Sequence, residues 1–424
     1  MKKVMELLEK NPQVSDYKIL IHKKESFELF FVKGKLETVR STDTCDKQVT
    51  VYVNHGEFKG DSLFYIYPST TDAQIEEKIQ SAVQNALLIN NQNYELPPAE
   101  TDEYIIPSNF SHYDPVALAT KIAQGVFDAN GVEHGSLNSV EVFINHHKNT
   151  VMNSKGLCKT QDKYDAMVEA IPTYNGEEQS VELYEQYNFN TLDMTVLQDE
   201  IARKMEEVKA RYTAQKPEQL PSCKIVLNKL ELEELFGSIA SDLNYATVYG
   251  HANLYKKGDN LQKNRTGDPI TVTMAGSVPG NVKSACFDSD GLSLGKVQLV
   301  ADGQAVSYYG SNRFGQYLGE KPTGNLSCLC VSPGSLDIDS LKLEPHLEVI
   351  SMSGLQVDFF NDYIGGEIRL AYYHDGTKCI PVTGISIAGK LQEVLSSIRL
   401  SVLTATHDRY TGPAKALIPN MNIF

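Results

Sequence analysis

Three glutamates near the middle of the chain, Glu231, Glu233 and Glu234, have side chains that could take part in metal chemistry. A zinc-binding helix commonly offers two imidazoles that reach one point, beside a glutamate that takes a proton from the metal-bound water. Residues 224–249 contain the glutamates but no histidine. The segment therefore holds one part of a zinc hydrolase site and lacks the ligands.

His146 and His147 are the only adjacent histidines in the chain. Neighbouring residues of a strand point to opposite faces, so the two rings would not reach one ion there, although they could in a turn. His251 and the Glu133–His134 pair are isolated in the sequence, which favours ordinary surface or hydrogen-bonded histidines. A metal role for any of these residues requires further ligands from elsewhere in the fold.

Two cysteines, Cys328 and Cys330, would share one face of a strand, as zinc-binding or redox-active thiols can. Cys286 and Cys379 are too distant in sequence to be taken as a second pair. The chain has 7 cysteines, an odd number, without the spacing of a disulfide framework. This usage favours free thiols in a reducing cytoplasm, where a buried cysteine behaves as a small hydrophobic residue.

Composition limits the classes of partner. The 424 residues include 39 basic and 54 acidic side chains, a formal charge of -15, and such a surface repels nucleic-acid phosphates. No apolar stretch is long enough to span a bilayer, and the first residues lack the apolar region of a signal peptide. We expect a cytoplasmic protein with no direct nucleic-acid or membrane partner.

The first half of the chain predicts an α+β fold in which one helix-and-strand unit occurs twice, over residues 1–98 and 99–216. Glycine turns at 54–57 and 174–177 occupy corresponding places in the two units and suit hairpins. Proline-rich segments follow each unit, at 96–100 and 215–221. The predicted helices are 4–9, 71–88 with Thr70 or Thr71 as N-cap, 115–128 and 192–211, and the predicted strands are 17–22, 28–32, 35–40, 48–53, 56–66, 139–144, 150–153, 164–172 and 179–189.

The second half, residues 222–424, predicts a mostly antiparallel sheet or barrel. Glycine-containing turns recur between short apolar runs, which is typical of hairpins. A buried strand at 225–227 leads into the glutamate-bearing helix at 229–243, and a second helix is expected at 391–400. The glutamates would therefore be mounted on a helix that follows a core strand.

The run from Phe287 to Asn325 resembles the C-terminal signature of the TldD/PmbA family, in which PmbA is also called TldE. A second resemblance lies at Pro381–Gly389, and a third at Asn153–Gly156, so the likeness covers nearly the whole chain. Within the first run the matching pieces are the Asp288–Gly291 turn, the Val297–Val300 strand, Asp302–Gly303, Asn312–Arg313, Leu318–Gly319 and Thr323–Asn325.

The resemblance implies a cytosolic protease system that acts on unfolded peptides, matures a peptide antibiotic and has been linked to modulation of DNA gyrase. Members of this family work as a heterodimer. Its TldD-type subunit carries zinc on a His-Glu-x-x-x-His helix, with a later cysteine as a further ligand. Its PmbA/TldE-type subunit lacks that set.

This chain departs from the zinc pattern. Leu232 and Gly237 stand at the two histidine positions and Glu233 at the glutamate, so these residues are not a ligand set. The last cysteine is Cys379, and no cysteine follows near the C-terminus where the family places its ligand. We expect a PmbA/TldE-like subunit with no catalytic residue and no metal of its own, which pairs with a zinc-bearing TldD-like subunit and helps to hold an unfolded peptide.

Two alternatives remain open. The chain could be a stand-alone metallopeptidase with a divergent metal site that uses His146, His147, His251 or the cysteines. It could also be a non-enzymatic modulator that binds a partner such as gyrase. Self-association into a homodimer is compatible with either alternative. The residues that would bind peptide are not identified, although Tyr308–Tyr309 and Tyr372–Tyr373 could line a groove or simply pack in sheets.

Overall fold

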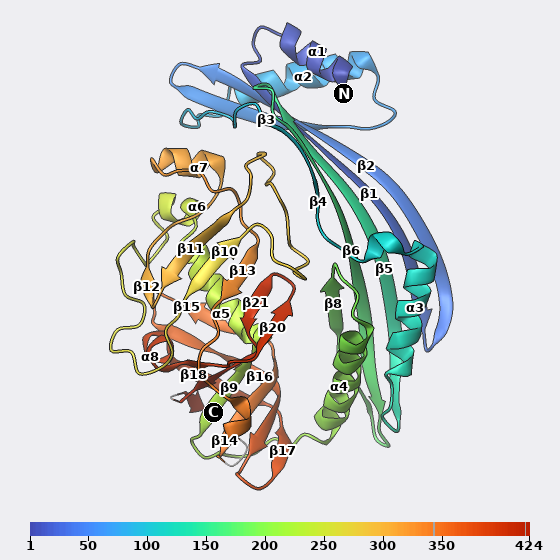
Figure 1. Cartoon of the computed structure of the whole chain (residues 1–424), viewed down its shortest axis with the longest axis vertical. Coiled ribbons are helices and arrows are strands. Elements are labelled where there is room, and N and C mark those ends of the chain that lie inside the picture. Colours follow the sequence, from blue (N-terminus) through green and yellow to red (C-terminus); the bar gives the residue numbers. More distant parts are fainter. Residues whose placement is uncertain (342–343, 420) are drawn as a thin grey trace.

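The N-terminal half is built on one long, curved sheet that arches beside the C-terminal half (Figure 1). This computed structural model describes residues 1–341, 344–419 and 421–424. The strand order is β3-β2-β1-β5-β6-β4, and β7 and β8 also pair with β6. The strands are β1 (Asp16–Val32), β2 (Lys35–His55), β3 (Phe58–Ile66), β4 (Thr101–Ile105), β5 (Gly135–Asn153), β6 (Cys158–Asn175), β7 (Ser180–Glu182) and β8 (Glu185–Phe189).

The predicted repeat is present as two helix–strand–helix units within this single sheet. The first contains α1 (Lys2–Lys10), β1 to β3 and α2 (Asp72–Ala86), and the second contains α3 (Pro115–Asp128), β5 to β8 and α4 (Met194–Thr213). The units meet where β1 pairs antiparallel with β5, from Lys18 opposite Asn153 to Val32 opposite Ser139. The α+β class is confirmed, while the boundaries at 98 and 216 stay a prediction.

Several predicted strands were too short because we ended them at polar residues. Residues 17–22 and 28–32 belong to one strand, β1, and the same holds for the pairs within β2 and β5. The backbone ladder continues through the polar stretch because neighbours on both sides bond it, and side chains pair across the strands, as Ser26 does with Thr42 at 2.6 Å. The predicted strand at 179–189 was too long, since β7 and β8 are separate.

The helices of this half follow the sequence signals closely. Thr71 caps α2 in a reciprocal capping box with Gln74, and Asp114 caps α3 ahead of Pro115. In Figure 1, α1 and α2 lie across the upper end of the arch, while α4 and β8 lie on its side that faces the C-terminal half. β8 and α4 are thus part of the face that the arch turns toward the rest of the molecule.

Gly60 on β3 allows the backbone at the end of α2 to approach the sheet closely. A Cβ at this position would overlap the Ala86 carbonyl oxygen and lie 2.8 Å from that of Ile89. We expect Gly60→Ala to lower the free energy of unfolding by about 1–3 kcal/mol, since backbone atoms must shift to admit it. Urea unfolding measures this, with Gly295→Ala as the matched control because nothing lies within 4 Å of its added Cβ. Equal losses for the two variants would contradict the prediction.

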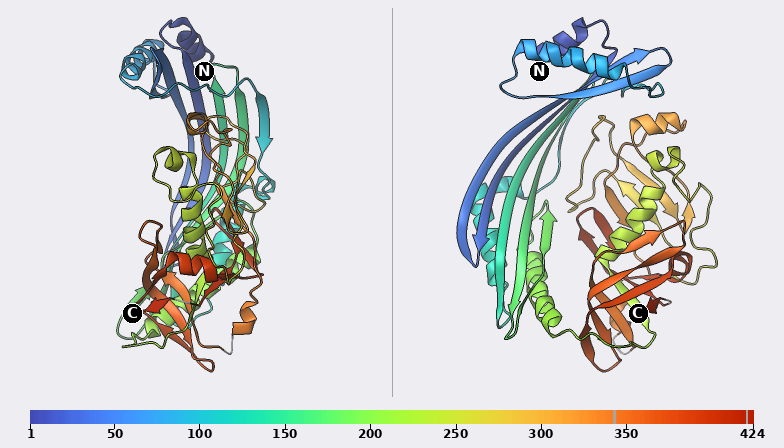
Figure 2. Two further views of the ribbon diagram at one scale, coloured as in Figure 1. Left: turned by 90° about the vertical axis from the view of Figure 1, so that its left-hand side faces the viewer. Right: turned by 180° about the vertical axis from the view of Figure 1, so that it is seen from behind.

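In the C-terminal half, two sheets enclose the helix α5 (Lys229–Asp242), as Figure 2 also shows from behind. One sheet has the order β12-β11-β10-β13-β21-β20, and the other β19-β22-β9-β14-β16-β18-β23, with β15 and β17 on β16. Their strands are β9 (Lys224–Asn228), β10 (Val272–Ala275), β11 (Lys296–Ala301), β12 (Gln304–Ala305), β13 (Cys328–Val331), β14 (His346–Met352), β15 (Gln356–Asp358), β16 (Tyr363–His374), β17 (Cys379–Val382), β18 (Ile385–Lys390), β19 (Arg399–Leu400), β20 (Thr404–His407), β21 (Tyr410–Pro413), β22 (Lys415–Ile418) and β23 (Asn422–Ile423).

The predicted antiparallel character of this half is largely confirmed, although β13 with β21 and β14 with β9 pair in parallel. The described residues form two separate sheets rather than one, because α5 inserts its apolar side chains between them. Three short helices complete the half: α6 (Tyr245–Tyr249), α7 (Asn312–Tyr317) and α8 (Leu391–Ser397), the last ending before the predicted residue 400. Within the described part of the chain, no helix combines the length and apolarity that crossing a membrane requires.

Candidate functional site

The helix α5 carries the glutamate that stands at the family's catalytic position. β9 leads directly into it, and the Asn228 side chain caps it by accepting from the Leu230 amide at 2.8 Å. Leu232 points into the core and is completely buried. Glu233, the next residue, faces the solvent-accessible side of the helix, with about 19% of its side chain exposed. The predicted strand-to-helix mount is therefore present, with the glutamate on its accessible face.

Two side chains from a distant hairpin hold Glu233. Arg409 Nε donates to Glu233 Oε1 at 3.2 Å, and His407 Nδ1 lies 3.2 Å from Glu233 Oε2. The same Arg409 guanidinium covers Gly237, where an added Cβ would overlap its terminal nitrogen. One arginine thus occupies the space beside both the glutamate and the second motif position.

The hairpin that supplies these groups is the tight turn between β20 and β21. His407 pairs with Tyr410 across it, so Asp408 and Arg409 form the loop, and Asp408 adopts a left-handed φ of 41°. Asp408 accepts an ion pair from Lys283 at 3.1 Å. The turn geometry and this ion pair fix the direction in which Arg409 extends over α5.

A zinc ion does not fit the motif positions of α5. Leu232 and Gly237 offer no ligand atom, and both oxygens of Glu233 already have partners. The guanidinium supplies one of the positive charges that a metal would bring, without an open coordination position for water.

Two adjoining cavities, of about 550 and 450 Å³, lie between the arch and the C-terminal half. They share Glu185 and Gln186 of β8, Leu230 of α5 and His407. We call this space the interdomain cleft. The larger cavity is lined by Tyr184, Glu185, Gln186, Asn188, Leu230, Glu231, Glu233, Glu234, Ser351, Met352, Gly354, Leu355, Arg369, His407, Asp408 and Arg409.

Glu231 is the unusual carboxyl group of the cleft. It is 4% exposed, and its Oε2 has no hydrogen-bond partner among the described residues. Burial raises its pKa to about 7 from the usual 4.5. Lys204, which partly offsets that rise, is itself paired with Glu185 and Glu207 at 2.7 Å each. Glu231 is therefore uncharged over much of the neutral-to-acid range.

The two adjacent histidines point to opposite faces of β5, as strand geometry predicts. His146 stacks on Tyr164 with centroids 4.3 Å apart, and its Nε2 lies 2.9 Å from an Asp162 oxygen. His147 Nδ1 faces His22 Nε2 at 3.1 Å, and its own Nε2 lies 3.2 Å from Asp165. The structure does not bring the two rings together.

The remaining single candidates are also separate from one another. Glu133 and His134 lie 3.9 Å apart on the surface, and His251 is exposed with a left-handed φ of 53°. All seven cysteines are free. Cys328 is buried and donates weakly to the Gly276 carbonyl at 3.6 Å, and burial raises the pKa of this thiol to about 11. Such a thiol is an inert packing residue.

Of the tyrosine pairs, only Tyr372 lines the cleft. Tyr309 is buried in the core, Tyr373 packs against that core, and Tyr308 has the Lys257 ammonium 4.9 Å from its ring centre. Sheet packing therefore accounts for most of them.

The signature residues form turns and contacts between the halves. Asp288 accepts the amides of Asp290 at 2.9 Å and of Asn325 at 3.0 Å, which joins the first and last pieces of the signature. Asp290 then pairs with Lys18 of β1 at 2.6 Å. On α7, Arg313 donates to Asn91 at 2.6 Å. These residues position the arch against the C-terminal half.

His407 and Arg409 were missed from the sequence. They lie far along the chain from Glu233, and nothing in the run around them resembles a known ligand or catalytic motif. A tight two-residue loop between short strands was the only local signal, and it predicts a hairpin without indicating its partner.

Two sequence comparisons match parts of this chain. Residues 221–423 match the model of the PmbA/TldA metallopeptidase C-terminal domain. A metalloprotease from Synechocystis is 36% identical over 91 residues, which spans about a fifth of each protein, 19% of this chain and 20% of the relative. The sequence matches therefore concern the C-terminal half and a short stretch.

Solved structures share the fold over the full length. TldE from Thermococcus kodakarensis superposes with a TM-score of 0.82 at 13% identity, over 100% of this chain and 99% of that one. A candidate modulator of a DNA gyrase from Thermotoga maritima gives 0.77 at 15% identity, over 100% and 99%. At such identities the likeness establishes the fold. Residues 221–423 of this chain therefore form a PmbA/TldA metallopeptidase C-terminal domain, and the whole chain has the fold of these solved structures.

Proposed function

We propose that this chain is the non-catalytic, PmbA/TldE-like subunit of a TldD/TldE-type metalloprotease that acts on unfolded peptides. The observation that carries the proposal is the Arg409 guanidinium, which pairs with Glu233 and covers Gly237. A hydrolytic zinc site requires imidazole ligands and an open position for water at that place. Here an arginine fills it, so the zinc would come from a TldD-like partner.

The cleft supports a role in holding peptide. Among the described strands, β8 pairs only with β6, which leaves its second edge free. That strand also lines both cavities of the interdomain cleft. An extended peptide could add to the free edge through backbone hydrogen bonds, which make few demands on its sequence. Unfolded chains of many sequences would then be acceptable.

The subunit would act in the cytoplasm, where its seven free cysteines stay reduced. We propose a heterodimer with the TldD-like chain as the working form, and a homodimer when this chain is made without it. Neither form requires a metal on α5. Nucleic acid is not expected as a direct ligand, since the formal charge is -15.

Replacing Glu233 with alanine tests this role. Cleavage of an unfolded peptide by the heterodimer should stay within about twofold of wild type, whereas loss of a zinc-site general base costs about 10²–10⁴-fold. Arg409 and His407 are each about a third exposed, so water can solvate them after the change. The measurement is kcat/KM at matched stability, with Glu393→Ala as control, because that exposed glutamate of α8 does not line the cleft.

Activity of the chain without its partner would decide against the proposal. If the purified chain cleaves peptide alone in a chelator-sensitive way, and Glu233→Ala abolishes that cleavage, α5 is a working metal site. Activity that requires the partner and survives Glu233→Ala supports the non-catalytic subunit.

A further inference from the structure

Four side chains with metal-ligand chemistry lie on one face of three neighbouring strands, and Glu348 among them also lines the smaller cavity of the interdomain cleft. His346 of β14 is the register partner of His374 of β16, and His374 is the register partner of Cys379 of β17. Glu348 lies two residues after His346, which places it on the same face. The register of the sheet therefore gathers two imidazoles, a carboxylate and a thiol.

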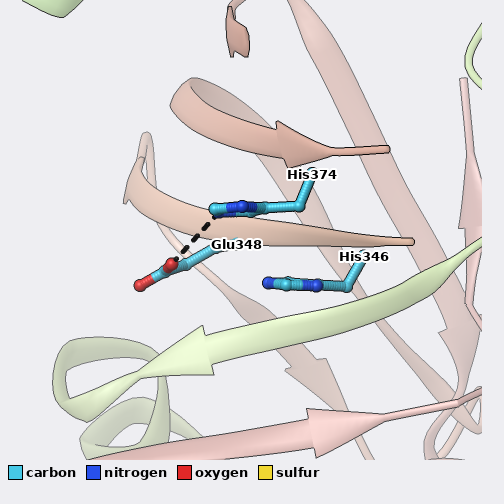
Figure 3. A group of neighbouring side chains, drawn as sticks. All are labelled: His346, Glu348 and His374. Atoms are coloured by element: carbon cyan, nitrogen blue, oxygen red, sulfur yellow. Dashed lines mark ion pairs between the residues drawn. The ribbon is translucent and has the colours of Figure 1, made fainter. Parts of the chain in front are cut away.

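The ligand atoms are near the spacing that a shared ion requires. The donor atoms of His346, Glu348 and His374 lie within 4.8 Å of one another (Figure 3). His374 Nε2 is 3.6 Å from Glu348 Oε2 and 3.8 Å from Cys379 Sγ. Nitrogen and oxygen ligands of one tetrahedral zinc are about 3.4 Å apart, and nitrogen and sulfur about 3.6 Å, from their bond lengths. Cys379 Sγ approaches His374 but lies outside the group of three, so its side chain must move toward His346 and Glu348 to complete the set.

Neighbouring groups leave the required atoms free. His346 Nδ1 lies 2.8 Å from the Glu344 carbonyl, to which it can donate, so Nε2 is the nitrogen that remains to bind. Lys415 pairs with Oε1 of Glu348 and leaves Oε2 toward His374. Carbonyl-bound imidazoles and hydrogen-bonded carboxylates are the usual supports of metal ligands.

A second pair of stacked histidines, His22 and His147, differs from His346 and His374 in how its ring nitrogens are bonded. In His22 and His147 the facing nitrogens lie 3.1 Å apart as a hydrogen bond, and Asp165 takes the other nitrogen of His147. The rings of His346 and His374 are stacked at 4.3 Å with only 10° between their planes, and no hydrogen bond joins them in the described structure. Figure 3 shows the two rings side by side, with Glu348 beside the end of the His374 ring.

We propose that His346, Glu348, His374 and Cys379 bind one divalent transition-metal ion of the zinc class. Two imidazoles, a carboxylate and a thiolate make a closed tetrahedral set, so the ion would join β14, β16 and β17 rather than activate water. The thiol proton of Cys379 is released to solvent on binding. The sequence led us to expect no metal on this chain, and this site, which uses none of the motif positions, revises that expectation independently of the subunit role.

Cobalt(II) titration of the full-length, chelator-stripped chain under argon tests the site. We expect one equivalent to bind with the visible bands of tetrahedral cobalt and a thiolate-to-cobalt charge-transfer band, and zinc to displace it. His374→Ala should weaken binding by at least about 100-fold, since loss of a supporting partner alone costs about 10–100-fold. Cys379→Ser, at an exposed position, should remove the charge-transfer band while the chain stays folded.

His147→Ala is the matched control, because it alters the other stacked pair, and it should bind cobalt as wild type does. The proposal is overturned if no stoichiometric cobalt binds, or if His374→Ala and Cys379→Ser bind it unchanged. The readout is cobalt binding and not peptidase activity. A chain that does not bind cobalt therefore leaves the proposed subunit role intact, and an overturned subunit role leaves the proposed metal site intact.

Discussion

Replacing Asp16 with alanine is expected to lower the free energy of unfolding by about 3–5 kcal/mol, the usual cost of breaking a buried ion pair. Lys59 Nζ donates to Asp16 Oδ2 at 2.8 Å and to the Tyr94 carbonyl at 3.0 Å. The side chains of Lys59 and Asp16 are only 1% and 5% exposed. Without the carboxylate, a buried ammonium has no counter-charge in a place that water does not reach.

Urea unfolding at neutral pH measures this loss of free energy. Two further variants test whether it comes from the buried ion pair. Asp16→Leu combined with Lys59→Met should cost much less, because an apolar pair of similar volume is often neutral. Glu25→Ala, which breaks the exposed pair with Lys23 on the same strand, should cost less than about 1 kcal/mol. A similar cost for Glu25→Ala and Asp16→Ala would contradict the expectation.

The same carboxyl gives an acid dependence. Burial raises the pKa of Asp16, but hydrogen bonds from Lys59 and Ser154 outweigh that effect, so its pKa lies below the usual 3.8. A depressed folded pKa means that the unfolded chain binds the proton first. The stability that ionised Asp16 contributes is present above pH 3.8 and is lost as the pH falls below it. The free energy of unfolding of Asp16→Ala should therefore fall less than that of wild type over this acid range.

Replacing Glu231 with glutamine should stabilise the chain at alkaline pH by about 3 kcal/mol and leave it nearly unchanged near pH 4. Burial raises the folded pKa to about 7, whereas the unfolded group titrates near 4.5. Between these values the folded state holds more protons, so wild-type stability falls as the pH rises, and above pH 7 the full penalty remains. Glutamine never ionises and escapes that penalty.

Unfolding curves from pH 4 to pH 9 check this difference. The informative quantity is how the gap in free energy of unfolding between wild type and Glu231→Gln changes with pH. Its absolute size is less informative, because the amide leaves a similar buried polar atom at every pH. Glu234→Gln on the same helix is the control, because that side chain is exposed. A gap that stays constant from pH 4 to pH 9 would contradict the prediction, because it would mean that Glu231 has the same pKa in the folded and unfolded chain.

The sequence predicted those elements whose signals are local. The Thr71 cap and Pro115 mark the starts of α2 and α3, and the change of period after Leu227 marks the passage from β9 to α5. The long strands were divided because polar residues such as Lys23 interrupt the apolar pattern, while pairing in the sheet does not depend on that pattern.

The candidate sites depend on contacts that no local pattern encodes. Glu233 was identified from its helix, but its partner Arg409 lies on a hairpin of another sheet. His346 and His374 are brought together only by the register of β14 with β16, and a shift of one residue would send one ring to the other face. Register follows from the packing of the whole sheet, so neither grouping could be predicted from spacing.

The pairing of β1 with β5 has a consequence for synthesis on the ribosome. Residues 18–32 pair with β2 inside the first unit, but they meet their β5 partners only after residues 139–153 have left the exit tunnel, so the arch cannot be completed while the first unit is being made. Until then, the edge of β1 that will meet β5 is open to other chains. A nascent chain stalled near residue 98 should therefore be captured by chaperones or aggregate. The pairing of β1 with β5 is thus the folding step at which translation rate and folding yield are linked.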